Sequence, residues 1–153
     1  MRLNPSEVFP QAGATLRAMA APLREAGLEA ALCELVYIRA SQLNGCAFCL
    51  DMHTRRALAA GEDGGRLHLI AAWRDAPCFT GRERAALAWT EAVTLVAQTH
   101  VPDDVYDEAS RHFEPAQLVA LTLAVVMING WNRLQVAFRI PAGNAHPSVG
   151  TRP

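Results

Sequence analysis

Two cysteines, one histidine and one glutamate occur within a stretch of twenty residues, ELVYIRASQLNGCAFCLDMH, at positions 34–53. Cys46 and Cys49 form a C-x-x-C pair, and His53 follows four residues later. Glu34 precedes the pair by twelve residues. These side chains can carry out thiol redox chemistry, in which the imidazole and the carboxylate move protons. They are also four potential zinc ligands. The stretch therefore indicates either a redox site or a metal site.

The spacing of the two cysteines and the histidine predicts that they share one face of a helix, over about residues 46–60, because they fall at i, i+3 and i+7. Cys46 would lie at the amino-terminal end of that helix. Free backbone N–H groups and the helix dipole favour a thiolate there. His53 would lie one turn after Cys49, where its imidazole can take up or return a proton.

Glu34 belongs to the preceding predicted helix, over about residues 28–43. Asn44 and Gly45 end that helix, since both residues tolerate the left-handed cap conformation. A turn this tight lets the two helices pack antiparallel, which would bring Glu34 towards His53. The sequence thus predicts a proton relay from Glu34 through His53 to a cysteine.

In the cleavage of a peroxide, such a relay can increase the rate in two ways, by forming the thiolate and by protonating the leaving oxygen. A free cysteine is only ~3% thiolate at pH 7, and lowering its pKa by about two units increases the thiolate ~25-fold. The accompanying loss of nucleophilicity removes ~8-fold of this gain. Protonation of the leaving oxygen by a positioned acid contributes more, ~10²–10⁴-fold. Proton donation is therefore the main task that we expect of His53 and Glu34.

The bulk composition fits one ordinary globular domain and excludes several kinds of chemistry. The chain has 153 residues, of which 51% are hydrophobic and 19% charged. Its net charge of −1 gives no electrostatic reason to expect binding to nucleic acid or to an anionic membrane. All fourteen basic residues are arginine, which excludes a Schiff-base lysine and a P-loop lysine.

The chain shows no targeting or membrane signal that we can identify. Its first twenty residues lack a continuous apolar region, and the longest apolar run, at 118–128, is too short to span a bilayer. We therefore expect a cytoplasmic protein, in which a C-x-x-C pair is more often catalytic or metal-binding than part of a disulfide framework.

The elements that must position these side chains are predicted to be helical, because no segment alternates with a period of two. We expect an all-α single domain of six to seven helices, at about 14–26, 28–43, 46–60, 63–73, 81–99, 103–112 and 115–139. Residues 1–12 are predicted to form an extended arm, and residues 142–153 a flexible tail. The run at 118–128 is apolar on every side, which indicates burial partly in a subunit interface and hence a homo-oligomer.

The spacing E-x11-C-x-x-C-x3-H, with Ser41, Asn44 and Gly45 before the first cysteine, resembles the alkylhydroperoxidase D-like (carboxymuconolactone decarboxylase) family. The segments RERAALAWTEAVT, at 82–94, and INGWNRLQVAFRIP, at 128–141, also look like stretches of its short, single-domain members. The resemblance implies an all-helical fold, a homo-trimer or homo-hexamer, and reduction of small-molecule hydroperoxides without a bound cofactor.

The same resemblance implies how the residues divide the work. Cys49 would attack the peroxide, and Cys46 would resolve the sulfenic acid to a Cys46–Cys49 disulfide. His53 and Glu34 would form the proton relay. The reductant would be an unidentified thiol or, as in the peroxidase branch of the family, a lipoyl-bearing protein. This chain has Phe48 where that branch has a histidine, so one contributor to proton handling or donor docking is missing.

Three other interpretations remain open from the sequence. One is a zinc-binding module that uses the two cysteines, His53 and Glu34, although no second ligand pair is present. A second is a non-redox, decarboxylase-like enzyme with His53 as acid–base; the decarboxylase members lack the cysteine pair. The third is a purely structural oligomer. Cys33 and Cys78 have no partner at motif spacing and are interpreted as structural.

The remaining polar cluster comes after the longest apolar run. Asn129, Asn132 and Arg133 follow it within five residues. Buried backbone groups and partners across a subunit interface both need polar side chains of this kind. We predict that the three satisfy such groups.

Overall fold

The computed structural model describes residues 1–143, and all regular structure in that range is helical. The predicted all-α fold is therefore confirmed, although short and divided helices make the number of helices in this range larger than the six to seven predicted. The elements are α1 (Pro5–Val8), α2 (Pro10–Ala18), α3 (Ala20–Glu25), α4 (Ala30–Leu43), α5 (Ala47–Ala59), α6 (Gly64–His68), the 3-10 turn η1 (Leu69–Ala72), α7 (Gly81–Thr94), α8 (Val96–Thr99), α9 (Asp103–His112) and α10 (Pro115–Ala137).

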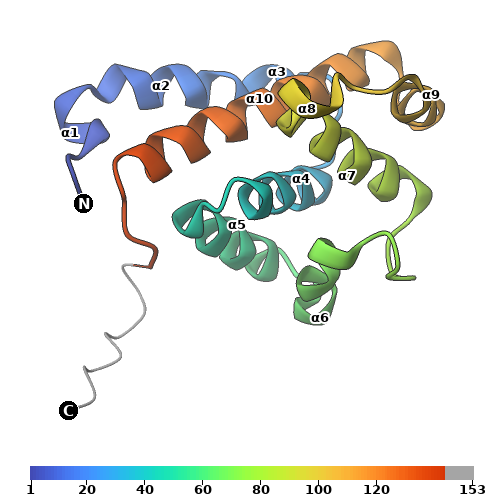
Figure 1. Cartoon of the computed structure of the whole chain (residues 1–153), viewed down its shortest axis with the longest axis horizontal. Coiled ribbons are helices and arrows are strands. Elements are labelled where there is room, and N and C mark those ends of the chain that lie inside the picture. The colour runs from blue at the N-terminus through green and yellow to red at the C-terminus, as the bar shows by residue number, and fades with distance from the viewer. Residues whose placement is uncertain (144–153) are drawn as a thin grey trace.

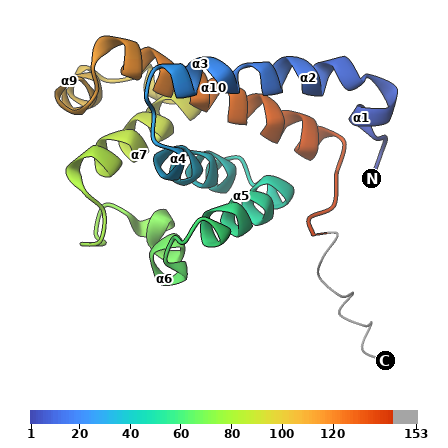
Figure 2. The same cartoon turned by 180° about the vertical axis from the view of Figure 1, so that it is seen from behind.

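The helices are arranged around an antiparallel pair, α4 and α5, which lies in the middle of the molecule (Figure 1). The long helix α10 crosses above this pair, and α2 and α3 run along the outer side of α10 (Figure 2). Helix α7 packs against both α4 and α10, while α6 and η1 lie below α4. Helix α4 is thus enclosed by elements from both ends of the chain, whereas α5 packs on α4 and α10 and keeps one side exposed.

Two apolar clusters hold these layers together. The larger cluster joins α4, α7 and α10, and includes the fully buried side chains of Val36, Leu121 and Ile128. The second cluster lies between η1 and α4 and packs Ile70 against Leu35 and neighbouring residues. Because α4 contributes to both clusters, with Val36 in one and Leu35 in the other, it is fixed on two sides. A side chain on α4 is therefore a rigid support for a site.

The N-terminal segment departs from the prediction of an extended arm. Asn4 caps α1 by accepting a hydrogen bond from the Ser6 backbone N–H at 3.1 Å, and Pro5 stands in the first turn. Pro10 opens α2 in the same way. Proline fixes φ near its helical value and lacks only an N–H that has no partner in a first turn. The two prolines, which suggested an extended chain, instead begin helices.

The other predicted helices are present, and some are divided. The range 14–26 is split between α2 and α3 at Met19, and the range 81–99 is broken at Leu95, where ψ is 29°. Thr80 and Glu83 form the reciprocal capping box that the sequence indicates at the start of α7. The predicted tail falls mainly on residues 144–153, which lie outside the described range.

Helix α10 is the central element that the apolar run predicts. By length and composition alone it could cross a membrane, but core helices pass the same test, and 44% of its most apolar window is buried within the bundle. Its outward side still carries apolar groups: Val119 is 70% exposed and Val126 is 48% exposed. These groups are compatible with the predicted oligomer, whose state stays a prediction.

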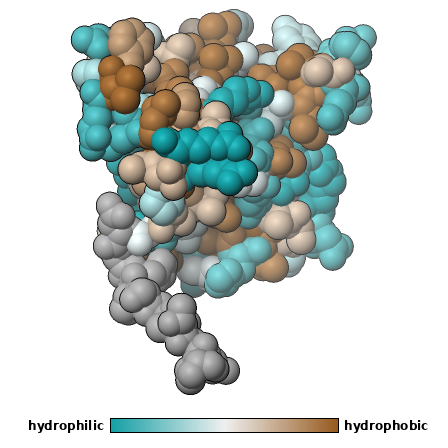
Figure 3. Space-filling model, turned by 60° about the vertical axis from the view of Figure 1, so that its left-hand side comes forward, coloured by the Kyte–Doolittle hydropathy of each residue, from teal (hydrophilic) through white to brown (hydrophobic). Residues whose placement is uncertain are grey.

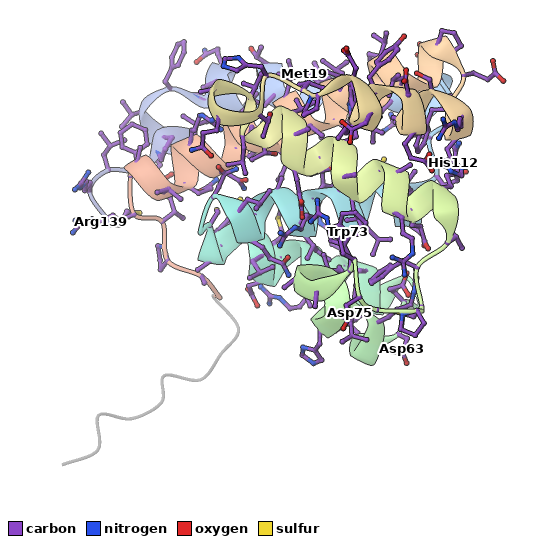
Figure 4. The ribbon with its side chains drawn as sticks, turned by 45° about the vertical axis from the view of Figure 1, so that its right-hand side comes forward. Met19, Asp63, Trp73, Asp75, His112 and Arg139 are labelled. Carbon is purple, nitrogen blue, oxygen red and sulfur yellow. The ribbon has the colours of Figure 1, made fainter. Side chains whose placement is uncertain are left out.

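Charged networks fix α7 and the loop before it. The Glu91 carboxylate accepts hydrogen bonds from Arg39 at 2.7 Å and from the Trp73 indole at 2.8 Å, and it pairs with Arg74 at 2.6 Å. Figure 4 shows Trp73 below α7, on the side of η1. Glu91 thus ties α7 to α4 and to the end of η1.

At the far end of α10, Arg139 lies beside the N-terminal segment (Figure 4), where the Arg2 backbone N–H donates to the Phe138 carbonyl at 2.8 Å.

Candidate active site

The turn between α4 and α5 places the first cysteine at the start of α5. Gly45 adopts φ +64°, in the left-handed region that glycine enters without a steric penalty, and this reverses the chain. Cys46 follows as the N-cap of α5, with extended backbone angles, and its sulfur accepts the Cys49 backbone N–H at 3.4 Å. The predicted position at the amino-terminal end of the helix is confirmed.

The antiparallel packing of α4 and α5 brings Glu34 and His53 together, as predicted. The carboxylate Oε2 of Glu34 lies 2.7 Å from Nδ1 of His53, and their side chains are only 19% and 7% exposed. The ring of Tyr37 packs against the imidazole, with centroids 4.9 Å apart and a 47° tilt. The imidazole is therefore held on two sides. Because Nδ1 is taken by the carboxylate, Nε2 is the nitrogen that can exchange a proton with a bound molecule.

The sulfurs of Cys46 and Cys49 are hydrogen-bonded to each other, and this bond shifts the pKa values of the two thiols in opposite directions. The Cys49 thiol donates a hydrogen bond to the Cys46 sulfur and so stabilises its thiolate. The backbone N–H groups of Cys49 and Phe48 and the Asn132 side chain donate further hydrogen bonds to the same sulfur. Together they lower the pKa of Cys46 to about 7, although burial opposes the shift. The same hydrogen bond, together with burial, raises the pKa of Cys49. The first proton lost by the pair therefore leaves a thiolate on Cys46, with Cys49 as its hydrogen-bond donor.

A cavity of about 540 Å³ brings the predicted residues to one surface. Cys49, His53 and Glu34 all line it, with Tyr37 beside them. Cys46 and Cys49 are both almost fully buried, at 2% and 1% exposed, but only Cys49 of the pair lines the cavity. A molecule in the cavity can thus meet the Cys49 sulfur first. Its other walls come from α2, α3, α5, α10 and the turn before α4, and they include Leu23, Leu28, Met52, Met127, Ile128 and Trp131.

A polar network behind the cysteine pair joins the turn to α10. Asn132 is 1% exposed; its amide donates to the Ser41 hydroxyl at 3.0 Å and its oxygen accepts from Asn44 at 2.9 Å. Asn44 also donates to Asn129 at 3.0 Å, and Arg133 donates to the same Asn129 oxygen at 2.7 Å. The polar cluster predicted to satisfy buried groups therefore bonds side chains of this same chain, in addition to one backbone carbonyl each for Asn129 and Arg133.

Some residues of the site are missed when the sequence is read by spacing alone. Cys33, interpreted as structural, lines the same cavity as Cys49, and burial raises the pKa of its thiol despite a hydrogen bond with Tyr37. Its thiol therefore stays protonated at neutral pH. Cys78 is exposed and lies outside the cavity. The contact of Tyr37 with the site could be predicted, because Tyr37 lies one helical turn after Glu34 and therefore on the same face of α4. The sequence predicts Asn132 only as part of a polar cluster, because its contacts with Ser41 and Asn44 depend on the path of α10.

Phe48 also lines the cavity and is partly buried against the larger apolar cluster. The position at which the sequence departs from the peroxidase branch therefore supplies an apolar wall beside Cys49. The hydrogen bond between Glu34 and His53 is made without any group from Phe48. Phe48 in place of a histidine therefore makes the cavity wall apolar, and the hydrogen bond between Glu34 and His53 is still present.

The alternative of a zinc site is not supported by the arrangement of its four candidate ligands. Within residues 1–143, no group of three or more His, Cys, Asp or Glu side chains is placed to hold a metal ion. The geometry gives the reason. Nδ1 of His53 is engaged by Glu34, and the Cys46 sulfur faces the Cys49 backbone N–H. The donor atoms point to one another in pairs and do not converge on a common centre.

The family model described as the carboxymuconolactone decarboxylase family matches residues 10–92 of the chain. This range contains Glu34, both cysteines of the pair and His53. The uncharacterized protein YdfG of Bacillus subtilis (strain 168) is 35% identical over 136 residues, which cover 89% of this chain and 92% of the relative. The match thus extends beyond the family model to nearly the whole chain.

Solved structures share the fold. The protein ATU0492 from Agrobacterium tumefaciens, of unknown function and assigned provisionally as an antioxidant defence protein AhpD, is 37% identical, with a TM-score of 0.88 over 93% of this chain and 97% of its own. An uncharacterized peroxidase-related protein from Silicibacter sp. TM1040 is 19% identical, with a TM-score of 0.75 over 86% and 70% of the two chains. Because only 19% of the residues are identical, the similarity to the Silicibacter protein concerns the fold alone.

Proposed function

The chain belongs to the carboxymuconolactone decarboxylase family, and we propose that it is a thiol-dependent hydroperoxidase that reduces organic hydroperoxides with the Cys46–Cys49 pair. One observation carries the proposal: Cys49 and His53 line the same cavity, and His53 is hydrogen-bonded to Glu34 at 2.7 Å. A nucleophilic sulfur and a proton donor thereby face the same bound molecule. This is the arrangement that cleavage of an O–O bond requires.

In the first step, Cys49 attacks the terminal oxygen of the hydroperoxide. The Cys49 proton passes to the Cys46 thiolate, to which it is already hydrogen-bonded. The new S–O bond forms as the O–O bond breaks, giving a sulfenic acid on Cys49. The leaving alkoxide takes a proton from Nε2 of His53 and departs as an alcohol. Glu34 holds Nδ1 and stabilises the imidazolium before this transfer.

In the second step, the Cys46 sulfur attacks the sulfenic acid sulfur. A Cys46–Cys49 disulfide forms and the hydroxyl group leaves as water, taking the proton that Cys46 received from Cys49, whereas the alcohol of the first step carries the proton from His53. The sulfur pair has then lost two electrons and the hydroperoxide has gained them. An external dithiol, either an unidentified thiol or a lipoyl-bearing protein, would return the pair to its reduced form by thiol–disulfide exchange.

Intact mass measurement of the reduced protein after addition of cumene hydroperoxide tests this function. We expect a loss of two hydrogens per chain that dithiothreitol reverses and that is absent in Cys49→Ser. Cys46→Ser should instead gain one oxygen, because the sulfenic acid on Cys49 cannot be resolved. Cys78→Ser is the matched control, since Cys78 lies outside the cavity, and it should behave as the unchanged protein. Persistence of all thiols under excess hydroperoxide would exclude the function.

A further inference from the structure

The size of the cavity beside Cys49 exceeds what hydrogen peroxide needs. Its volume is about 540 Å³, whereas one water molecule occupies ~30 Å³ of the liquid. The space would therefore hold well over ten water-sized groups, and it lies within the usual range for small-molecule sites. Its apolar lining includes Leu23, Leu28 and Ile128, which are almost fully buried. The cavity is thus suited to a molecule with a sizeable apolar body.

Three arginines from separate helices also line this cavity: Arg17 on α2, Arg24 on α3 and Arg56 on α5. All three side chains are exposed, in contrast to the buried walls, so they stand where the cavity reaches solvent. Figure 3 shows the side of the molecule that carries α1, α5 and the end of α10, where hydrophilic side chains are interspersed with apolar ones.

The charge at this opening is not balanced by carboxylates of the chain. Six arginines of the described range pair with acidic groups, as Arg39 does with Glu91 and Arg82 with Glu29. No ion pair of Arg17, Arg24 or Arg56 occurs within residues 1–143; Arg17 lies over the Trp131 ring at 5.9 Å. The acidic side chain that lines the cavity, Glu34, is engaged by His53.

The wall also carries a polar atom that the protein leaves without a partner. The side-chain oxygen of Gln135 is buried and accepts no hydrogen bond from the described residues, and Gln135 lines the cavity close to Trp131 in sequence. An acceptor buried without a partner is costly, so such an atom on a cavity wall indicates a ligand with a donor group. The O–H of a hydroperoxide or of its alcohol product is such a donor.

We propose that this cavity binds amphipathic carboxylates, and that the hydroperoxide reduced at Cys49 carries a carboxylate on an apolar chain. The apolar body would lie along the buried walls, with its carboxylate at the exposed arginines. Guanidinium groups recognise carboxylates through charge-assisted hydrogen bonds, which are stronger than neutral ones. The second part of the proposal rests on the proposed hydroperoxidase function, whereas the first part does not.

A binding experiment tests the carboxylate site without any turnover. Octanoate and octanol share one apolar chain and differ in charge, and their affinities for the reduced protein can be compared by isothermal titration calorimetry. We expect octanoate to bind about tenfold more tightly, a difference of about 1.4 kcal/mol, and to lose this advantage as ionic strength rises. The triple variant Arg17→Gln/Arg24→Gln/Arg56→Gln should bind the two probes equally.

Arg55→Gln is the matched control for this comparison. Arg55 neighbours Arg56 but pairs with Asp51 and does not line the cavity. The preference for octanoate should therefore survive this substitution. A preference that also survives in the triple variant, or equal binding of both probes to the unchanged protein, would overturn the carboxylate site. Thermal unfolding of each variant confirms that it is folded.

An oxidation experiment separates the carboxylate site from the proposed function. The reduced protein is mixed with linoleic acid hydroperoxide or with its methyl ester, and disulfide formation is followed by mass in a single turnover. We expect the acid to react about tenfold faster, and this ratio to fall to about one in the triple variant. Equal rates for acid and ester would overturn the substrate class but leave a hydroperoxidase. Octanoate binding without oxidation by any hydroperoxide would leave the carboxylate site but remove the proposed function.

Discussion

His53 Nδ1 lies 2.7 Å from Glu34 Oε2, across the interface between α5 and α4. The hydrogen bond fixes which imidazole nitrogen remains for chemistry, because a ring held at Nδ1 presents Nε2. Tyr37 limits the rotation of the ring from a second direction, with its centroid 4.9 Å away. The pair is mostly buried, so its geometry depends on how α4 and α5 pack and not on flexible surface groups.

Glu34→Gln tests whether this hydrogen bond serves catalysis. The amide can still contact His53 but cannot stabilise an imidazolium, so we expect the rate of cumene hydroperoxide reduction to fall ~10–100-fold. Disulfide formation by diamide, which needs no protonation of a leaving oxygen, should change little. The control is Glu29→Gln, because Glu29 is the N-cap of α4 and pairs with Arg82 away from the cavity. Equal losses in both reactions would argue against a proton-transfer role.

The unequal sharing of the proton between the two thiols predicts how the pair titrates. Hydrogen bonds from Cys49 lower the pKa of Cys46 to about 7, while the pKa of Cys49 is raised. A lowered pKa means that the thiolate forms as the pH rises through about 7, well below the value of about 8.5 for a free cysteine. The ultraviolet absorbance of the thiolate, measured in a Cys78→Ser background, should therefore show one thiolate per chain with a midpoint near 7.

Two controls identify this transition. Unfolding in urea should move the midpoint up towards about 8.5, because the hydrogen bonds to the Cys46 sulfur are lost. Cys46→Ser should abolish the transition near pH 7 in the folded protein. A transition that persists in Cys46→Ser would place the thiolate on Cys49 instead.

How far the sequence predicts this site depends on the sequence distance between its parts. The Glu34–His53 contact is predictable because both residues belong to two helices joined by the Asn44–Gly45 turn, which sets their register. The contact between Asn44 and Asn132 spans 88 residues and depends on the angle at which α10 crosses α4, which no local pattern encodes. The break between α2 and α3 at Met19 is likewise missed, since Met19 is a good helix former.

Asn132→Ala tests the polar network behind the cysteines. The side chain is 1% exposed, and its removal leaves Ser41 and Asn44 each without one hydrogen-bond partner, so we expect a loss of about 2–4 kcal/mol in the free energy of unfolding. The thiolate midpoint should also move to higher pH, because Asn132 helps to lower the pKa of Cys46. Asn129→Ala should be similarly unstable with the midpoint unchanged; a shift of the midpoint in both variants would indicate a general loosening.

Glu91→Gln tests the charged network that ties α7 to α4. The substitution leaves Arg39 and Arg74 without a charged partner, and we expect it to lower the free energy of unfolding by about 1–3 kcal/mol at pH 7. Although burial acts in the opposite direction, hydrogen bonds from Arg74 and Trp73 and the charge of Arg39 lower the pKa of Glu91.

The sign of that shift predicts how the effect depends on pH. A carboxylate whose pKa is lowered on folding contributes its full stability above its unfolded pKa of about 4.3 and loses it as the pH falls through the folded value. The difference between the unchanged protein and Glu91→Gln, measured by urea unfolding, should therefore shrink below about pH 4.3. A difference that is constant over pH 3–7 would show that the charge of Glu91 is not what stabilises the network.

Exposed valines on α10 predict association of the chain with copies of itself. Val119 and Val126 are seven residues apart, so they lie on the same face of the helix, and they are 70% and 48% exposed. We expect a homo-trimer or homo-hexamer whose interface includes this face, since burial of apolar surface is the main favourable contribution to such association. Sedimentation equilibrium should give a mass several times that of one chain. Val126→Glu should reduce that mass, because it would place a charge in the interface, whereas Leu58→Glu, on the exposed side of α5, should not. A single-chain mass for the unchanged protein would contradict the prediction.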